Sequence, residues 1–285
     1  MSGVEKNHAA KGGNNMFFDE GNLADLMNSG KVNVTISTNA AEYDDAMGFE
    51  NGNEDYGIPL ALYFIAPFPL PAVVGGNNKR DFSGCGHSGY PCSTIAFSAN
   101  LRFSSSDKDI LLDPSFVWSE ETEMTTGEWK VKCAQKNTRI VISPPFPTDS
   151  SSLITVTQPA TMTNITFALP LSLNSRTSFI QCNGNSLTLN SCGFSITNSE
   201  ESNEINFSFA KISGGTFVAN GFVVVAETNN KAFSESMFLF EGGSSFTLQS
   251  CEFNGITVKN GNGGLLYSNA NGGDSEIVID GCQIS

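Results

Sequence analysis

The chain has 285 residues, a net charge of −14 and only 15% charged residues. This composition excludes nucleic-acid binding, because phosphate contacts need clustered Lys and Arg, and it disfavours electrostatic attachment to anionic lipid. Hydrophobic residues make up only 39%, and Gly, Ser, Asn and Thr are abundant, as is typical of turns and stacked strands. The 22 Phe residues could fill a long apolar interior.

Residues 1–75 are expected to form a separate N-terminal segment with a helix–strand unit and some disorder. Asn22–Met27 has the apolar spacing of a helix, and Val32–Ile36 alternates as a half-buried strand does. Residues 38–56 are acidic and rich in Gly and Asn, which predicts a loop or disorder. The apolar run Ile58–Val74 contains four prolines, so we expect no transmembrane segment.

The next segment combines a Gly-rich loop with a short helix. Ser93 is a suitable N-cap, and Ile95–Leu101 has one apolar helical face. Asp109–Leu112 then has the character of a short strand, closed by Asp-Pro. A disulfide between Cys85 and Cys92 would brace the loop, and the alternative is that each is simply a loop cysteine.

From residue 140 onward the chain is a series of short β-type runs, among which a repeat can be aligned. In each repeat window the second, fourth, seventh and ninth places are apolar or small, which predicts inward side chains on a strand and its corner. The windows are Ser186–Phe194, Ser245–Phe253 and Glu276–Ile284, with Glu204–Ser213 as a fourth if Ala210 takes the cysteine place. We therefore expect Cys192, Ala210, Cys251 and Cys282 to stack in the interior, at spacings of 18, 41 and 31 residues.

These motifs resemble a known family. The Cys-x-Phe motifs, Gly263–Tyr267 and Phe217–Asn220 are similar to the repeats of polymorphic outer-membrane-protein-like β-helices, and more broadly to the pectin-lyase-like superfamily. The segment Gly84–Pro114 resembles the opening loop, capping helix and first strand of such proteins. The resemblance covers roughly residues 72–285, with little support between 115 and 175.

The resemblance implies an all-β fold, a right-handed parallel β-helix over residues 76–285 with a short N-terminal capping helix. The sequence stops inside a repeat window at Ser285, which we interpret as truncation within a repeat. An open coil exposes unpaired strand groups and an apolar cross-section, so end-to-end self-association is expected.

Catalysis is not expected. The resemblance implies that lyases of this superfamily bind Ca²⁺ with several carboxylates and that hydrolases pair two aspartates. The acidic residues of the repeat region are sparse: Glu241, Glu252, Asp274, Glu276 and Asp280. We therefore assign no catalytic, cofactor-binding or metal-binding residue. The alternative function is that of a polysaccharide lyase or glycoside hydrolase. Bound Ca²⁺ is expected only under that alternative.

The sequence thus predicts a non-catalytic, secreted or cell-surface β-helix with an adhesive, carbohydrate-contacting or structural role. Its expected partners are carbohydrate or other surface proteins. Sequons at Asn33, Asn164 and Asn206 agree with an extracellular location, although Met1–Asn15 shows no signal peptide.

Overall fold

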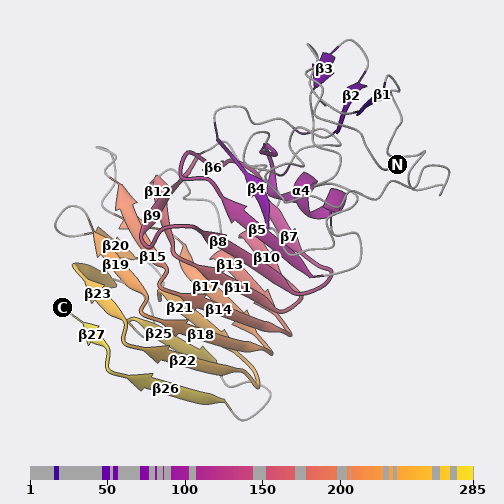
Figure 1. The fold of residues 1–285 in the computed structure, drawn as a ribbon. Coiled ribbons are helices and arrows are strands. Elements are labelled where there is room, and N and C mark those ends of the chain that lie inside the picture. Colours follow the sequence, from indigo (N-terminus) through magenta and orange to yellow (C-terminus); the bar gives the residue numbers. More distant parts are fainter. Residues whose placement is uncertain are drawn as a thin grey trace.

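Short strands pair with strands about one repeat further along the chain, and this pairing builds a parallel β-solenoid (Figure 1). The computed structural model describes residues 16–18, 47–51, 54–56, 71–76, 81, 86, 91–102, 107–143, 152–170, 178–197, 204–205, 207–226, 231–233, 236–258, 264–269 and 275–284. In each coil the chain passes through sheet 1, then sheet 2, then sheet 3, and returns to sheet 1. The prediction of a parallel β-helix is confirmed, and its right-handed twist stays a prediction.

The strands of each sheet are parallel and in register. Sheet 1 contains β4 (Ala72–Val74), β5 (Lys108–Leu112), β8 (Trp129–Cys133), β11 (Ala160–Thr163), β14 (Ser186–Asn190), β18 (Thr216–Asn220), β22 (Ser245–Gln249) and β26 (Glu276–Asp280). Sheet 2 contains β6 (Val117–Trp118), β9 (Thr138–Ile142), β12 (Ile165–Pro170), β15 (Gly193–Thr197), β19 (Val223–Ala226), β23 (Glu252–Asn254) and β27 (Gln283–Ile284). Sheet 3 contains β7 (Thr122–Met124), β10 (Ser152–Val156), β13 (Ser178–Asn183), β17 (Ser208–Ser213), β21 (Phe238–Glu241) and β25 (Leu266–Asn269). A small parallel sheet of β16 (Glu204–Ile205), β20 (Lys231–Phe233) and β24 (Ile256–Val258) lies between sheets 2 and 3 along the chain.

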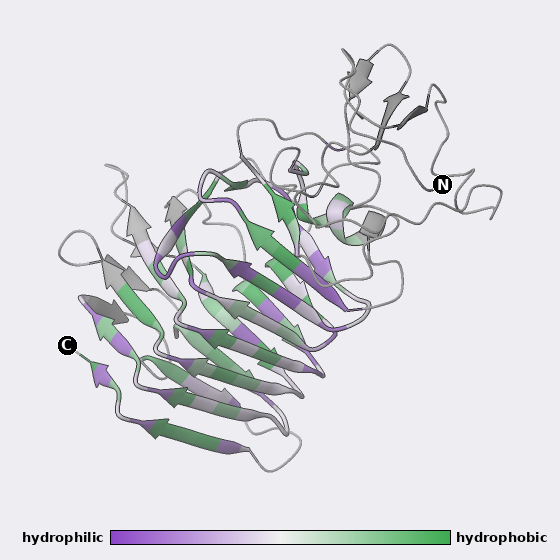
Figure 2. Cartoon of the chain, viewed as in Figure 1, coloured by the Kyte–Doolittle hydropathy of each residue, from purple (hydrophilic) through white to green (hydrophobic). Residues whose placement is uncertain are grey.

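The core is built from rows of inward side chains that repeat from coil to coil. In sheet 1, Leu187, Phe217 and Phe246 are register partners, and all three are fully buried. The neighbouring residues on each strand point outward, because successive side chains of a strand alternate between its faces. Figure 2 shows this alternation as changing bands of hydropathy along the strands.

Phe side chains make a continuous aromatic column through the middle coils. Phe209 is completely buried and stands at its centre. Its ring centroid lies 5.0 Å from Phe222, 5.1 Å from Phe194, 5.7 Å from Phe179, 5.9 Å from Phe238 and 6.4 Å from Phe167. These separations are typical of favourable aromatic pairs, so the many Phe residues of the sequence hold adjacent coils together.

From the β8–β9 connection onward, each corner between sheets 1 and 2 contains one left-handed residue. The φ angles there lie between 49° and 62° for Asn137, Asn164, Ser191, Gly221, Ser250 and Gly281. At Asn164, Ser191, Gly221 and Ser250 the corner also bonds to the next coil, as when the Ser191 N–H donates to the Asn220 carbonyl at 2.8 Å. Gly and Asn suit this conformation best, so the corner explains part of the high Gly and Asn content.

Helix α4 (Ile95–Arg102) packs near β4 and β5. The prediction of Ser93 as its N-cap is wrong, because the Thr94 hydroxyl accepts the Phe97 N–H at 3.2 Å. Thr94 directly precedes the first helical residue, and that position lets a side chain reach the third helical N–H. The Asp81 carboxylate accepts the N–H groups of Ser93 and Thr94 at 2.8 and 3.1 Å. The role of this helix as a cap of the solenoid stays a prediction.

Glu120 gives the start of α4 a dependence on pH. Its Oε1 accepts the Ile95 N–H at 2.8 Å, and burial, opposed by backbone hydrogen bonds, raises the pKa of its carboxyl above the usual value. The folded state therefore binds the proton more tightly than the unfolded state does. Protonation of Glu120 therefore stabilises the folded state. This stabilisation is fully present below the pKa of Glu120 in the unfolded chain, and it is lost as the pH rises through the pKa in the folded chain.

Glu120→Gln keeps an oxygen acceptor for the Ile95 N–H but cannot ionise. We expect it to be more stable than the wild type at pH 7, and to lose that advantage in acid. Urea unfolding at pH 4 and at pH 7 measures the difference, with the exposed Glu123→Gln on β7 as the control. A wild-type pH profile in Glu120→Gln would show that this carboxyl is not responsible.

The structure also describes three short strands of the N-terminal segment. β1 (Met16–Phe18) pairs in parallel with β2 (Met47–Asn51), which pairs antiparallel with β3 (Glu54–Tyr56). The prediction of loop or disorder for residues 38–56 is therefore wrong over β2 and β3. Acidic composition concealed the hairpin, because a short two-residue connection can set up strand pairing without apolar alternation. The helix and strand predicted at Asn22–Met27 and Val32–Ile36 lie outside the described residues.

Candidate functional site

The outer face of sheet 1 presents three polar rows that cross the coils. The first row contains Ser186, Thr216, Ser245 and Glu276, which begin successive strands. The second contains Thr161, Thr188, Val218, Thr247 and Val278, and the third Thr163, Asn190, Asn220, Gln249 and Asp280. Adjacent strands lie about 4.8 Å apart, so the rows place hydroxyl and amide groups at regular intervals along the solenoid.

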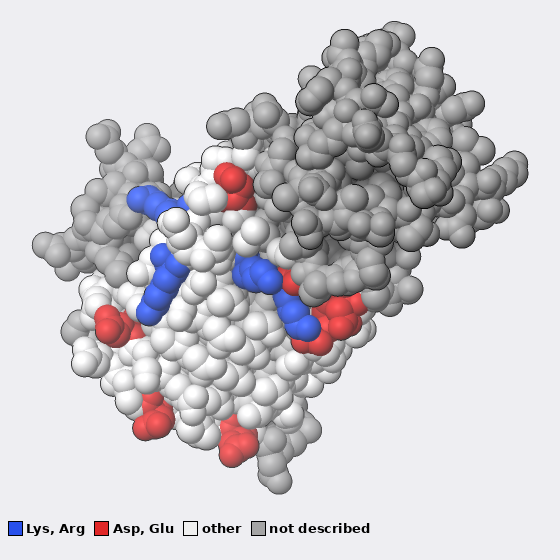
Figure 3. Space-filling model, in the orientation of Figure 1, with Lys and Arg blue, Asp and Glu red and all other residues white. Residues whose placement is uncertain are grey.

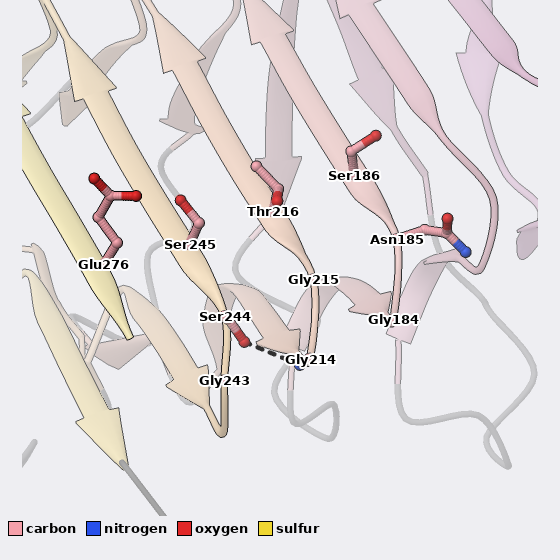
Figure 4. Close-up of a pocket in the computed structure, with 10 residues that line it drawn as sticks. All are labelled: Gly184, Asn185, Ser186, Gly214, Gly215, Thr216, Gly243, Ser244, Ser245 and Glu276. Carbon is pink, nitrogen blue, oxygen red and sulfur yellow. Dashed lines mark hydrogen bonds between the residues drawn. The ribbon is translucent and has the colours of Figure 1, made fainter. Parts of the chain in front are cut away.

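A trough of about 510 Å³ follows the first row at the corner between sheets 3 and 1 (Figure 4). Three tripeptides from successive coils and one further residue line it: Gly184–Ser186, Gly214–Thr216, Gly243–Ser245 and Glu276. Gly184, Gly214 and Gly243 have φ angles of 71°, 70° and 63°, and no heavy atom lies within 4 Å of where their Cβ would be. These three glycines are exposed, and their missing side chains leave the turn side of the trough open.

Some polar groups of the trough are committed to holding the coils together. The Ser244 hydroxyl accepts the Gly214 N–H at 2.9 Å and donates to the Glu241 carbonyl at 2.6 Å. The Asn185 side-chain amide donates to the Thr157 carbonyl of the preceding coil. In contrast, the side chains of Ser186, Thr216 and Ser245 make no hydrogen bond within the described part of the chain. Their three hydroxyls are available to a ligand.

Charged groups border this surface and leave its centre neutral. Lys132 pairs with Asp109 at 2.9 Å on the early coils of sheet 1, whereas Lys211 and Glu241, 3.2 Å apart, belong to sheet 3. Figure 3 shows an uncharged area in the middle of the visible face with acidic and basic groups around it. An acidic chain that keeps one polar surface neutral presents a surface suited to an uncharged partner.

The third row contains an asparagine ladder. The Asn220 side-chain amide donates to the Asn190 Oδ1 at 2.9 Å, and such ladders help to fix the register of stacked coils. Asn220 Oδ1 is buried and has no hydrogen-bond partner. The ladder therefore stops at Gln249, whose longer side chain is exposed.

The interior cysteine positions are partly as expected. Cys192 and Cys251 are buried, Cys282 is half-buried, and all three follow the corner between sheets 1 and 2. Assigning Ala210 to this row is wrong: it is buried but lies in sheet 3, paired with Ile180 and Phe238. Phe222 fills the place instead, 30 residues after Cys192. The mistaken window was only 18 residues from Cys192, less than one coil.

Burial makes the interior thiols weak acids. It raises the pKa of Cys192 and Cys133 to about 12 and that of Cys251 and Cys182 to about 11. Because the thiolate is the reactive form, we expect iodoacetamide at pH 8 to label Cys282 first. Peptide mass spectrometry of the native chain should find Cys192 and Cys251 unlabelled until denaturant is added. Equal labelling of all three cysteines would contradict the interior placement.

The other candidate residues are only partly described. Cys92 is buried, and its backbone forms an isolated parallel β-bridge with Val74. Cys85, Asn33 and Asn206 lie outside the described residues. The disulfide therefore stays a prediction. Asn164 occupies a left-handed corner, and its side-chain amide donates to the Cys133 carbonyl at 3.4 Å. Its glycosylation also stays a prediction.

The described acidic residues of the repeat region lie on strands of three different sheets. Glu241 belongs to sheet 3 and Glu252 to sheet 2, whereas Glu276 and Asp280 begin and end β26. Four residues of strand separate the last two by roughly 13 Å, more than the spacing of paired glycosidase carboxylates. Within the described ranges there is no group of three or more His, Cys, Asp or Glu that could hold a metal ion. Asp274 is not described.

Comparison of the chain with models of protein families, with curated proteins and with solved structures found no match. In the part of the chain that the structure describes, no helix has the length and apolar character needed to cross a membrane.

Proposed function

We propose that this chain is a non-catalytic, secreted or cell-surface solenoid that contacts carbohydrate through the outer face of sheet 1. The observation that carries the proposal is the uncharged, largely polar area that the three outward rows form on β14, β18 and β22. Hydroxyl and amide groups are the natural partners of sugar hydroxyls, because each can donate and accept hydrogen bonds. The resemblance to polymorphic outer-membrane-protein-like repeats and to the pectin-lyase-like superfamily belongs to the same proposal.

A matched pair of substitutions in one coil tests this surface. Val218 lies in the middle of the outward rows of sheet 1, and Val223 lies on the outer face of sheet 2, only five residues further on. Val218→Lys places a charge on the proposed binding face, and Val223→Lys places the same charge on a different face. Binding of each variant to immobilised neutral glycans should be measured together with its circular dichroism spectrum.

We expect Val218→Lys to weaken binding by roughly tenfold, since an unpaired ammonium would have to lose water in the complex. Val223→Lys should bind as the wild type does. Equal effects of the two variants, or no binding of the wild type to any neutral glycan, would contradict the proposal. Incubation with these glycans should release no reducing or unsaturated sugars, and turnover would favour the alternative of a lyase or hydrolase.

A further inference from the structure

We infer that the trough between sheets 3 and 1 binds a single neutral glycan chain that runs across the coils, along the axis of the solenoid. This inference rests on the proposed function and assigns it a site, a ligand direction and a selectivity. The trough crosses the starts of β14, β18, β22 and β26 (Figure 4). A ligand in it would contact a similar set of groups on each coil.

The turn side of the trough is open because of the residue type at each turn. Gly184, Gly214 and Gly243 are left-handed, a conformation that Asn also tolerates. An Asn side chain would project into the open space, whereas glycine leaves that space empty. The turns would form with either residue, but only glycine preserves the trough.

The wall supplies one free hydroxyl per coil. Ser186, Thr216 and Ser245 are register partners, so their hydroxyls repeat at about 4.8 Å. An extended β-linked pyranose chain advances by a similar distance per sugar, so successive sugars can meet successive hydroxyls. The described residues of the lining form no apolar side-chain pocket of the kind that peptide recognition uses. These features favour a sugar chain over an extended peptide.

The charge of the trough sets its selectivity. Among the described residues of the lining, Glu276 is the one that can ionise, and none of them is Lys or Arg. An acidic glycan would bring its carboxylates toward Glu276 without a compensating cation, and like charges repel. The trough should therefore prefer neutral glycans to acidic ones.

The decisive variant fills the trough without straining the turn. Gly214→Asn places a side chain on the turn side of the lining, at a φ of 70° that Asn accepts. Gly221→Asn is the matched control: it lies in the same coil, has a φ of 62° and equally open surroundings, but stands at the opposite end of β18. Thr216→Val removes one wall hydroxyl and keeps the side-chain shape.

Binding of the full chain to hydroxyethylcellulose, a soluble neutral β-glucan, and to polygalacturonate is measured by affinity electrophoresis. We expect Gly214→Asn to weaken hydroxyethylcellulose binding by about tenfold or more, and Gly221→Asn to leave it unchanged. Thr216→Val should weaken it by about two- to tenfold, the value of one hydrogen bond. Glu276→Gln should strengthen polygalacturonate binding by a few-fold at low salt.

The outcomes separate the trough from the wider face. If Gly214→Asn binds glycan as the wild type does while Val218→Lys loses binding, the trough is not the binding site. The proposed function of the wider face of sheet 1 would still hold. A wild-type chain that binds neither polymer would overturn both. If Gly214→Asn and Gly221→Asn lose glycan binding equally, the substitutions disturb the coil and do not act on a local site. That result would also contradict the assignment of the trough as the glycan site.

Discussion

Replacing Gly215 with alanine should destabilise the solenoid by about 3 kcal/mol or more. A Cβ at this position would collide with the carbonyl oxygen of Asn185 and lie 3.0 Å from its backbone nitrogen. These are backbone atoms of the adjacent coil, and the Thr216 N–H donates to the same Asn185 oxygen at 3.0 Å. The coils cannot separate to admit a methyl group without losing such hydrogen bonds. Urea unfolding followed by circular dichroism measures the loss.

The neighbouring Gly214→Ala is the control for this prediction. Gly214 is left-handed but has open surroundings, so alanine there incurs only the conformational cost of about 1 kcal/mol. We expect the two variants to differ clearly in unfolding midpoint. Similar, small losses for both would mean that the coils do not approach as closely at Gly215 as the structure has it.

Phe209→Ala should lower the free energy of unfolding by about 3–5 kcal/mol. The Phe209 ring is fully buried and contacts five other Phe rings from its own and neighbouring coils. Its removal leaves a cavity at the centre of the aromatic column. Since a solenoid is held together by contacts between neighbouring coils, the unfolding transition should also broaden as the two halves lose their coupling.

Phe209→Leu retains most of the apolar volume and should cost less than half as much as Phe209→Ala. Calorimetry of both variants tests the size of the effect and the loss of cooperativity together. A loss below about 1 kcal/mol with an unchanged, sharp transition would show that the column does not couple the coils.

The sequence was sufficient for the fold because inward apolar residues repeat along the strands. The windows ending at Phe194, Phe253 and Ile284 begin on consecutive or nearly consecutive strands of sheet 1. The repeat cannot be recognised in the sequence of coils in which another residue replaces the cysteine. Ile165 and Phe222 hold the cysteine place in their coils, because the interior there requires an apolar side chain and not sulfur itself. This is why residues 115–175 offered no visible motif although they contain regular coils.

The candidate trough could not be predicted in the same way. Its glycines were understood only as turn residues, and the sequence does not distinguish a left-handed glycine such as Gly214 from one required by close approach, such as Gly215. The available signal was a small-residue motif at the coil period: Gly184-Asn-Ser, Gly214-Gly-Thr and Gly243-Ser-Ser. Which hydroxyls are free depends on contacts between coils, and a linear pattern does not contain these.

The three sides of the coil differ in how much sequence they can accept. In the middle coils the corner between sheets 1 and 2 contains one left-handed residue, and the turn from sheet 3 to sheet 1 is two or three residues. The connection from sheet 2 to sheet 3 varies: it runs from Pro170 to Ser178 in one coil and from Ala226 to Phe238 in another. In the middle coils the largest divergence in length is therefore found on one ridge. That ridge is the place where a peptide tag or a whole foreign domain could be grafted while the pitch of the stack and the proposed binding face on sheet 1 stay unchanged.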